Sequence, residues 1–271
     1  MANNLQYAAI FQAELDKAAK EQATSGWMEL NDKLVRYNSG SEVKIPMLDM
    51  DGLADYDRQT GFVEGSVDLT WQTKKMAMDR GRQFTFDEQE VNDTNFVLTA
   101  SSVMGEFQRT KVVPEIDAYR YSTLAALAAA KDRAVYGYTP EEATILKKLY
   151  ADLASIQDEV GDDTPLVITM STQVAALFDM NTTLARSVSP TDFRQGDITL
   201  KVKSLNGQHP IIRVGSGRLK TCYLIDAATT ENQVKGGFTP ADDAQDINWI
   251  ICPRSAPIAV SRTDKVRIFD P

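Results

Sequence analysis

Histidine is nearly absent from this chain of 271 residues, and cysteine is scarce. The single histidine, His209, precedes Pro210 beside a predicted tight turn, where an isolated imidazole is more often a surface residue than a catalyst. The two cysteines, Cys222 and Cys252, lack the spacing and companions of a zinc site, and we expect two reduced core thiols. The H-E-x-x-H, Walker A and G-x-S-x-G motifs are missing as well. We therefore expect no catalytic residues, no metal and no cofactor, and do not interpret the chain as an enzyme.

Long apolar runs and an excess of basic residues are also missing. The alanine-rich stretch 124–130 is too short to span a membrane, and residues 1–5 do not begin a secretory signal. We expect no membrane association and folding in a cytoplasm. The formal net charge of −9 argues against nucleic-acid binding through a basic face. It is compatible with a protein that only encloses nucleic acid.

Carboxylates are concentrated between residues 49 and 57, which is the one cluster that suggests a cation site. A calcium loop of the EF-hand type needs glycine at its sixth position and glutamate at its twelfth. Neither the register that starts at Asp49 nor the one that starts at Asp51 provides them. We interpret Asp55, Asp57 and Arg58 as a charged loop tip.

Apolar residues recur at every second position in 41–47 and in 65–72, which predicts two strands. A tip rich in glycine and aspartate at 48–64 joins them into a long hairpin. An isolated two-stranded hairpin is marginally stable in water, so this one must lie on its own core or on another subunit. We expect one apolar face made of Val43, Ile45, Val67, Leu69 and Trp71.

Two segments have the spacing of amphipathic helices. Residues 1 to about 24 fit equally well a helix on the protein's own core and an arm that crosses onto a neighbour. The second segment is longer, and Pro114 predicts a kink or boundary at 111–114. Its apolar stripe, which we assign to a core sheet, consists of Phe96, Ala100, Val103, Phe107, Ile116, Tyr119, Thr123 and Leu127. Its charged residues off that stripe are Glu106, Arg109, Lys111, Glu115, Asp117 and Arg120.

The remaining chain alternates helical and strand patterns. Thr139, Pro140 and Glu142 form a start signal for a helix that runs to about residue 157. A buried strand at 166–170 and a short helix at 171–179 follow. Strands at 198–202 and 210–214 flank the turn pair Asn206-Gly207. Further strands are expected at 222–225, 249–251, 258–260 and 266–269, so the predicted class is α+β.

Residues 42–121 contain several distinctive segments. The longest is G-E-F-Q-R-T-K-V-V-P-E-I-D-A-Y-R at 105–120, and shorter ones are V-K-I-P at 43–46, G-L-A-D-Y-D-R at 52–58 and D-R-G-R at 79–82. In these segments the chain resembles the major capsid proteins of phages of low-GC Gram-positive bacteria. The closing D-K-V-R-I-F-D-P at 264–271 is also similar to the family. Between about 138 and 246 only the order of the elements is similar.

The resemblance implies a tailed-bacteriophage major capsid protein of the Hong Kong 97-like fold. It implies an N-terminal arm at 1–40, an extended hairpin loop at 41–80, a peripheral domain with a spine helix at 81–138 and 245–271, and an axial domain at 139–244. The hairpin would then lie across a neighbouring subunit. The implied subunit-interface residues are Val43, Ile45, Asp55, Asp57, Arg58, Val67, Leu69, Trp71, Glu106, Arg109, Glu115 and Arg120.

The implied function is structural. The subunit would assemble into pentamers and hexamers of an icosahedral head shell that encloses double-stranded DNA without sequence-specific contact. A separate scaffolding protein and a portal are expected partners, because no large scaffolding segment precedes the arm. Assembly would take place in the host bacterial cytoplasm, and the product would be part of the virion.

Three other readings stay open at this point. An encapsulin-type nanocompartment subunit would share the fold but enclose a cargo enzyme. A hydrolase or other soluble enzyme would need a nucleophile and base that a single histidine does not supply. A phage tail-tube protein would be mostly β and would lack a long helix.

Overall fold

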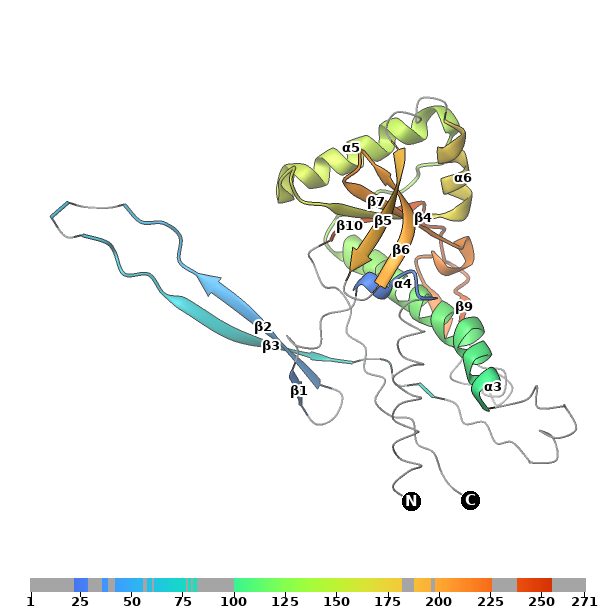
Figure 1. The fold of residues 1–271 in the computed structure, drawn as a ribbon, viewed down its shortest axis with the longest axis horizontal. Coiled ribbons are helices and arrows are strands. Elements are labelled where there is room, and N and C mark those ends of the chain that lie inside the picture. The colour runs from blue at the N-terminus through green and yellow to red at the C-terminus, as the bar shows by residue number, and fades with distance from the viewer. Residues whose placement is uncertain are drawn as a thin grey trace, which may run out of the picture. The chain divides into compact units, whose positions relative to one another are not determined.

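The computed structural model describes residues 22–28, 36–38, 42–55, 58–59, 61–76, 78, 80–81, 100–181, 188–195, 198–225 and 238–254. The chain divides into two compact units. We call Met1–Glu29 together with Phe86–Pro271 the body, and Leu30–Thr85 the hairpin unit. Helices and several sheets are both present, which confirms the α+β class (Figure 1). Among the described residues, no helix is long and apolar enough to cross a membrane.

The helical elements of the described residues are η1 (Gly26–Met28), α3 (Ala100–Phe107), η3 (Gln108–Val112), α4 (Val113–Ala130), α5 (Glu142–Val160), α6 (Thr172–Met180) and η5 (Ser216–Arg218). The strands are β1 (Arg36–Asn38), β2 (Glu42–Met50), β3 (Val67–Lys75), β4 (Leu166–Ser171), β5 (Val188–Gln195), β6 (Ile198–Leu205), β7 (His209–Val214), β8 (Tyr223–Ile225), β9 (Phe238–Pro240) and β10 (Trp249–Pro253). The predicted strands at 258–260 and 266–269 lie outside the described residues.

A five-stranded sheet in the order β10-β4-β7-β6-β5 forms the centre of the body. Only β4 and β7 run parallel among its paired strands, and the other pairs are antiparallel. The strand β10, from the range assigned to the peripheral domain, is hydrogen-bonded to β4, from the range assigned to the axial domain. One sheet therefore joins the two ranges.

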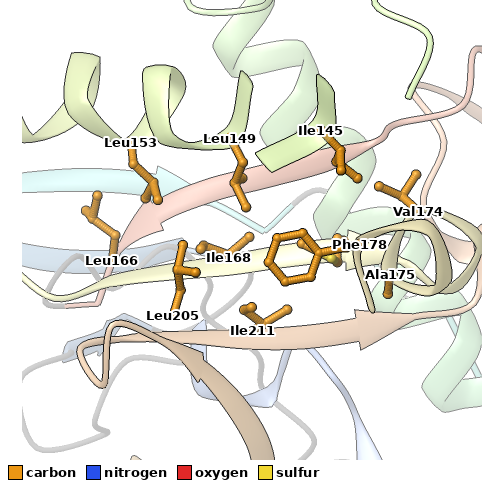
Figure 2. Close-up of a cluster of buried hydrophobic side chains, with 11 residues drawn as sticks. Ile145, Leu149, Leu153, Leu166, Ile168, Val174, Ala175, Phe178, Leu205 and Ile211 are labelled. Atoms are coloured by element: carbon orange, nitrogen blue, oxygen red, sulfur yellow. The ribbon is translucent and has the colours of Figure 1, made fainter. Parts of the chain in front are cut away.

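One face of this sheet is covered by α5 and α6. Figure 2 shows Leu149 and Leu153 of α5 beside Leu166 and Ile168 of β4, with Phe178 of α6 in the same cluster. All five side chains are at most 2 % exposed. Because successive residues of a strand point to opposite faces, the apolar positions 166, 168 and 170 serve this layer.

The opposite face is covered by α4 and by the segment that contains η1 (Figure 1). Val167 of β4 and Ile212 of β7 pack there with Tyr121 of α4 and with Trp27 and Met28. Trp27 also meets Phe193 edge to face, with ring centroids 6.3 Å apart. Within the predicted arm at 1–40, Trp27 and Met28 are thus part of the body's core, and residues 1–21 lie outside the described residues.

The long helical region changes its hydrogen-bonding pattern where Pro114 removes a donor. The segment η3 is a π-helical turn, in which the N–H of Val113 donates to the carbonyl oxygen of Gln108, five residues back. Proline cannot make the ordinary bond to the carbonyl four residues back, and a π-turn shifts that pairing. The predicted boundary near 111–114 is confirmed, as a π-turn between α3 and α4.

The apolar stripe predicted for this helix is wrong along α4. The residues of α4 that are buried are Val113, Asp117, Ala118, Arg120 and Tyr121. The predicted residues are instead half-buried, as are Ile116 and Tyr119, or exposed, as are Thr123 and Leu127. The prediction failed because the inward side includes two charged residues, which the apolar pattern counted as outward. Phe96 lies outside the described residues.

The turn and capping predictions in the second half of the chain have different outcomes. The turn at Asn206-Gly207 is confirmed between β6 and β7, and both residues have positive φ, at 54° and 75°. The side chain of Ser171 caps α6 by accepting from the N–H of Val174. The predicted capping by Thr139 is wrong, because α5 begins at Glu142 with Glu141 as its extended N-cap.

Candidate functional site

The hairpin unit is built on a regular antiparallel ladder. β2 and β3 pair from Glu42↔Lys75 to Met50↔Val67, and they form one long ribbon (Figure 1). β1 pairs with β2 only at residues 42–44, so β2 has no described partner on that edge from Ile45 to Met50. β3 is an edge strand of this three-stranded sheet along its whole length.

The register divides the candidate residues between the two faces of the ribbon. Directly paired residues of antiparallel strands share a face, and successive residues alternate. Trp71 therefore shares a face with Pro46, and Leu69 with Leu48. Ile45 lies on the opposite face, paired with Gln72. The prediction of one apolar face for all five hairpin residues is wrong.

One face carries only apolar side chains from the pair Pro46↔Trp71 to the pair Met50↔Val67, and we call it the apolar face. It consists of Pro46, Leu48, Met50, Val67, Leu69 and Trp71. The other, mixed face carries Val43, Ile45, Met47 and Asp49 opposite Lys74, Gln72, Thr70 and Asp68. Leu48 and Met50 were not among the predicted face residues, because the tip was expected to begin at residue 48. Their recurrence at every second position after Pro46 was the sequence signal that would have found them.

The apolar face is largely exposed. Leu48 is 60 % exposed, Leu69 57 % and Met50 64 %. Of the fifteen large hydrophobic residues that are exposed among the described residues, nine lie between Met47 and Trp71. In contrast, Val43 at the base of β2 is buried, at 1 %. Exposed apolar surface of this extent typically marks a contact site for another macromolecule.

A side-chain hydrogen bond closes the ladder at its distal end. The Oδ2 atom of Asp51 accepts from the N–H of Ser66 at 2.7 Å and from its Oγ at 2.9 Å, and the N–H of Asp51 donates to the Ser66 carbonyl oxygen. These bonds to Ser66 lower the pKa of Asp51 from its usual value. Beyond this closure lie Leu53, Phe62 and Val63, all strongly exposed.

The distal half of the hairpin is acidic and its base is basic. The described carboxylates there are Asp49, Asp51, Asp55, Glu64 and Asp68, with Arg58 as the described cation. The base carries Lys44, Lys74 and Lys75 beside Glu42. The structure places Asp55 and Arg58 in the exposed tip, and Asp57 lies outside the described residues.

The charged candidates of the long helix divide between surface and interior. Glu106 and Arg109 are exposed and form a two-point ion pair, with distances of 2.6 and 3.0 Å. Glu115 is half-buried. Arg120 is only 8 % exposed, and its Nη1 donates to the carbonyl oxygen of Ser25 at 3.1 Å. Arg120, which was predicted at a subunit interface, therefore makes its contact inside the subunit.

Arg120 belongs to a polar network that fixes residues 24 and 25 on α4. The carboxylate of Asp117, fully buried, accepts from the N–H and hydroxyl of Thr24 at 3.2 and 2.9 Å. It also accepts from the N–H and hydroxyl of Ser25 at 3.0 and 2.6 Å. Arg218 approaches the same carboxylate at 3.4 Å. A buried charge with this many donors is satisfied, so the network is structural.

The described part of the body also contains a hollow and two cysteines. Within the described ranges, no group of His, Cys, Asp or Glu side chains has the arrangement to hold a metal ion. A hollow of about 220 Å³ is lined by polar residues, among them Ser171, Ser216, Asp246 and Asn248, and by apolar neighbours. Both cysteines are free thiols, Cys252 buried and Cys222 half-buried. Burial raises the pKa of Cys252 to about 11, so it stays a thiol at neutral pH.

His209 is buried, which makes the surface prediction wrong. It is 3 % exposed, and its Nδ1 accepts from the N–H of Leu166 at 3.1 Å. Burial lowers its pKa from the usual value of 6.5. The imidazole therefore links β4 to β7 as a neutral side chain.

Comparison of the chain with models of protein families, with curated proteins and with solved structures found no match.

Proposed function

We propose that this chain is a shell-building subunit, the major capsid protein of a tailed bacteriophage with the Hong Kong 97-like fold. The observation that carries the proposal is the apolar face of the hairpin, which is exposed along the whole distal part of the ribbon. Burying it against a neighbouring subunit removes that surface from water, which is the main driving force of association. The matching segments at 43–46, 52–58 and 105–120 support the same family.

In this proposal the hairpin is the extended loop, the region α3–η3–α4 is the spine helix, and the sheet lies in the remainder of the body. The subunits form pentamers and hexamers that close into a shell around double-stranded DNA. Scaffolding protein and portal act as separate partners. A subunit of this kind needs contacts rather than a catalytic centre, and its charges serve geometry and solubility.

The test is assembly. The chain is expressed alone and together with a scaffolding protein and a portal of a phage of this type, and the products are examined by electron microscopy and sedimentation. Closed icosahedral particles are the expected result. A homogeneous monomer at high concentration with both partners present would overturn the proposal. Release of DNA from particles made in an infected cell separates a phage head from a nanocompartment, which would release protein cargo.

A further inference from the structure

Among the described sheets, β3 is the one long edge strand that contains no proline. The other edge strands are three residues long, as are β1, β8 and β9, or contain proline, as do β5 at Pro190 and β10 at Pro253. Short length and proline are common means of keeping an edge from pairing with a further strand. All nine residues of β3 are exposed, and no described strand pairs with its outer edge. A further strand can therefore be added to β3.

The ladder of the ribbon determines which backbone groups of β3 point to that outer edge. The N–H of Asp51 donates to the carbonyl oxygen of Ser66 at 3.2 Å, so these two residues form a hydrogen-bonded pair. Hydrogen-bonded and non-hydrogen-bonded pairs alternate along an antiparallel ladder. Trp71 is therefore in a non-hydrogen-bonded pair with Pro46, which suits a residue that has no N–H. It follows that the outward backbone groups of β3 belong to positions 67, 69, 71, 73 and 75.

We infer that the outer edge of β3 pairs with the same edge of a second copy of the chain, antiparallel and about a two-fold axis at Trp71. A two-fold contact uses the same surface of both copies. Both strands must present their outward backbone groups, so each odd-numbered residue has to meet an odd-numbered one. Pairing about Trp71, the midpoint of β3, satisfies this condition and uses the whole strand, with Val67 opposite Lys75 at either end.

Charge favours this register over its neighbours. On the mixed face it sets Asp68 opposite Lys74 of the second copy, twice about the axis. Within its own ribbon, Asp68 lies opposite Asp49, and Lys74 lies opposite Val43. Like charges directly opposite each other destabilise a sheet, and opposite charges stabilise it. An axis at residue 70 would set Asp68 opposite Gln72, and an axis at residue 72 would set it beyond the end of β3.

The pairing joins the apolar faces of two ribbons into one surface. Because paired residues share a face, Leu69 and Trp71 of both copies lie on the same side of the joined sheet. The apolar side chains stay uncovered by the edge contact itself, so they remain available for burial during shell assembly. The inference goes beyond the proposed function, since edge pairing needs a second copy but no shell.

Disulfide trapping tests the pairing and its register, because two Cα atoms more than about 7 Å apart cannot be bridged. Both chains carry Cys222→Ser, which removes the half-buried native thiol, and the buried Cys252 is retained. One chain carries Thr70→Cys and the other Gln72→Cys. These positions meet across the axis as a non-hydrogen-bonded pair, with Cα atoms about 4.5 Å apart. After mild oxidation of the concentrated mixture, a non-reducing gel should show a covalent dimer that neither chain forms alone.

Each chain oxidised by itself is the control for register. In the proposed pairing, Thr70 lies diagonally from Thr70 of the second copy, about 7–8 Å away, which is too far for a bond. A mixture of Thr70→Cys with Thr73→Cys is the control for the face, because Thr73 lies on the same side as Trp71. Neither control should give a dimer. A dimer from Thr70→Cys alone would put the axis at residue 70 and overturn the inference.

A charge exchange gives a second test that needs no oxidation. Asp68→Lys sets lysine opposite Lys74 of the second copy, although within its own ribbon it replaces a repulsion from Asp49 by an attraction. Sedimentation of the unassembled chain at low salt should therefore show a loss of dimer in this variant, and equally in Lys74→Asp. The variant with both substitutions restores opposite charges and should restore the dimer.

The outcomes separate this inference from the proposed function. A mixture of Thr70→Cys and Gln72→Cys that gives no covalent dimer overturns the inference. Single charge variants that dimerise as well as the native chain overturn it too. Neither result bears on the proposed function, which is judged by the formation of particles.

Discussion

The side chain of Asp117 shows how one buried charge can determine where a segment attaches to the fold. Its two oxygens accept four hydrogen bonds from Thr24 and Ser25, and Arg120 donates to the carbonyl oxygen of Ser25 from the same helix. These bonds hold the end of the N-terminal region on α4, where Trp27 enters the core. The cost of burying the carboxylate is offset by these four hydrogen bonds and by the nearby Arg218 guanidinium.

Removing this carboxylate should destabilise the body strongly. Asp117→Ala leaves the buried N–H groups of Thr24 and Ser25 without an acceptor, and we expect a loss of about 3 kcal/mol in the free energy of unfolding. Urea denaturation followed by circular dichroism measures it. Asp158→Asn, on the exposed side of α5, is the matched control and should leave the urea midpoint in place. An Asp117→Ala midpoint equal to that of the control would show that the network contributes nothing.

His209 should make stability depend on pH. Its folded pKa lies below the unfolded value of 6.5, so the unfolded state binds the proton more readily. The free energy of unfolding therefore rises as the pH rises through the window between the folded pKa and 6.5, and is lower on the acid side. Urea midpoints measured across that window test this. Since no second histidine is present, His209→Gln should remove the slope there. A slope unchanged in that variant would assign it to other groups.

These same residues show what could not be read from the sequence. His209 and Arg120 are polar, and the ordinary expectation for a polar side chain is the surface. Their burial depends on partners distant in sequence, Leu166 for the imidazole and Ser25 for the guanidinium. Long-range hydrogen bonds of this kind leave no local pattern.

At the scale of the element, alternation identified the hairpin strands but not their faces. Val43 and Ile45 of β2 and the apolar residues of β3 were recognised, yet the two sets were combined as though they pointed the same way, and Leu48 and Met50 were assigned to the tip. In an antiparallel pair, a shift of one residue moves every side chain to the other face. The actual register places Leu69 opposite Leu48. The side of α4 that faces the core was misread for a similar reason, because Asp117 and Arg120 belong to the buried side.

The difference between the two hairpin faces gives a sharp prediction for assembly. Leu69→Asp puts a charge on the apolar face, and Thr70→Asp puts the same charge on the mixed face one residue away. Losing the burial of one leucine costs about 2 kcal/mol, which weakens each contact roughly 30-fold. We expect Leu69→Asp to abolish particles and Thr70→Asp to retain them.

Both substitutions are at exposed positions of β3, so the fold of the isolated subunit should not distinguish them. Equal circular dichroism spectra and equal urea midpoints confirm that point. Particle yield by sedimentation is then the deciding measurement. Normal particles from Leu69→Asp would mean that the apolar face does not take part in assembly.

At the scale of the whole molecule, the chain combines a well-packed body with a long exposed ribbon. The sheet has a buried layer on each face, so the body buries the apolar residues of β4 and β7 by itself. The ribbon has no comparable core, since every residue of β3 is exposed. Such a division suits a subunit whose body is stable by itself and whose ribbon buries its apolar side chains only on assembly.

The net charge of −9 gives the last prediction, for nucleic acid. Binding through phosphates requires clustered lysine and arginine, and it weakens steeply between 50 and 200 mM salt as counterions are released. Three exposed arginines, Arg109, Arg133 and Arg213, are each paired with a carboxylate of the same chain. A shell that confines DNA needs no attraction between subunit and duplex. We expect the isolated subunit to leave the fluorescence anisotropy of labelled duplex DNA unchanged, even at low salt. A tight complex that dissociates as salt is added would contradict this, and would assign the chain a DNA-contacting surface.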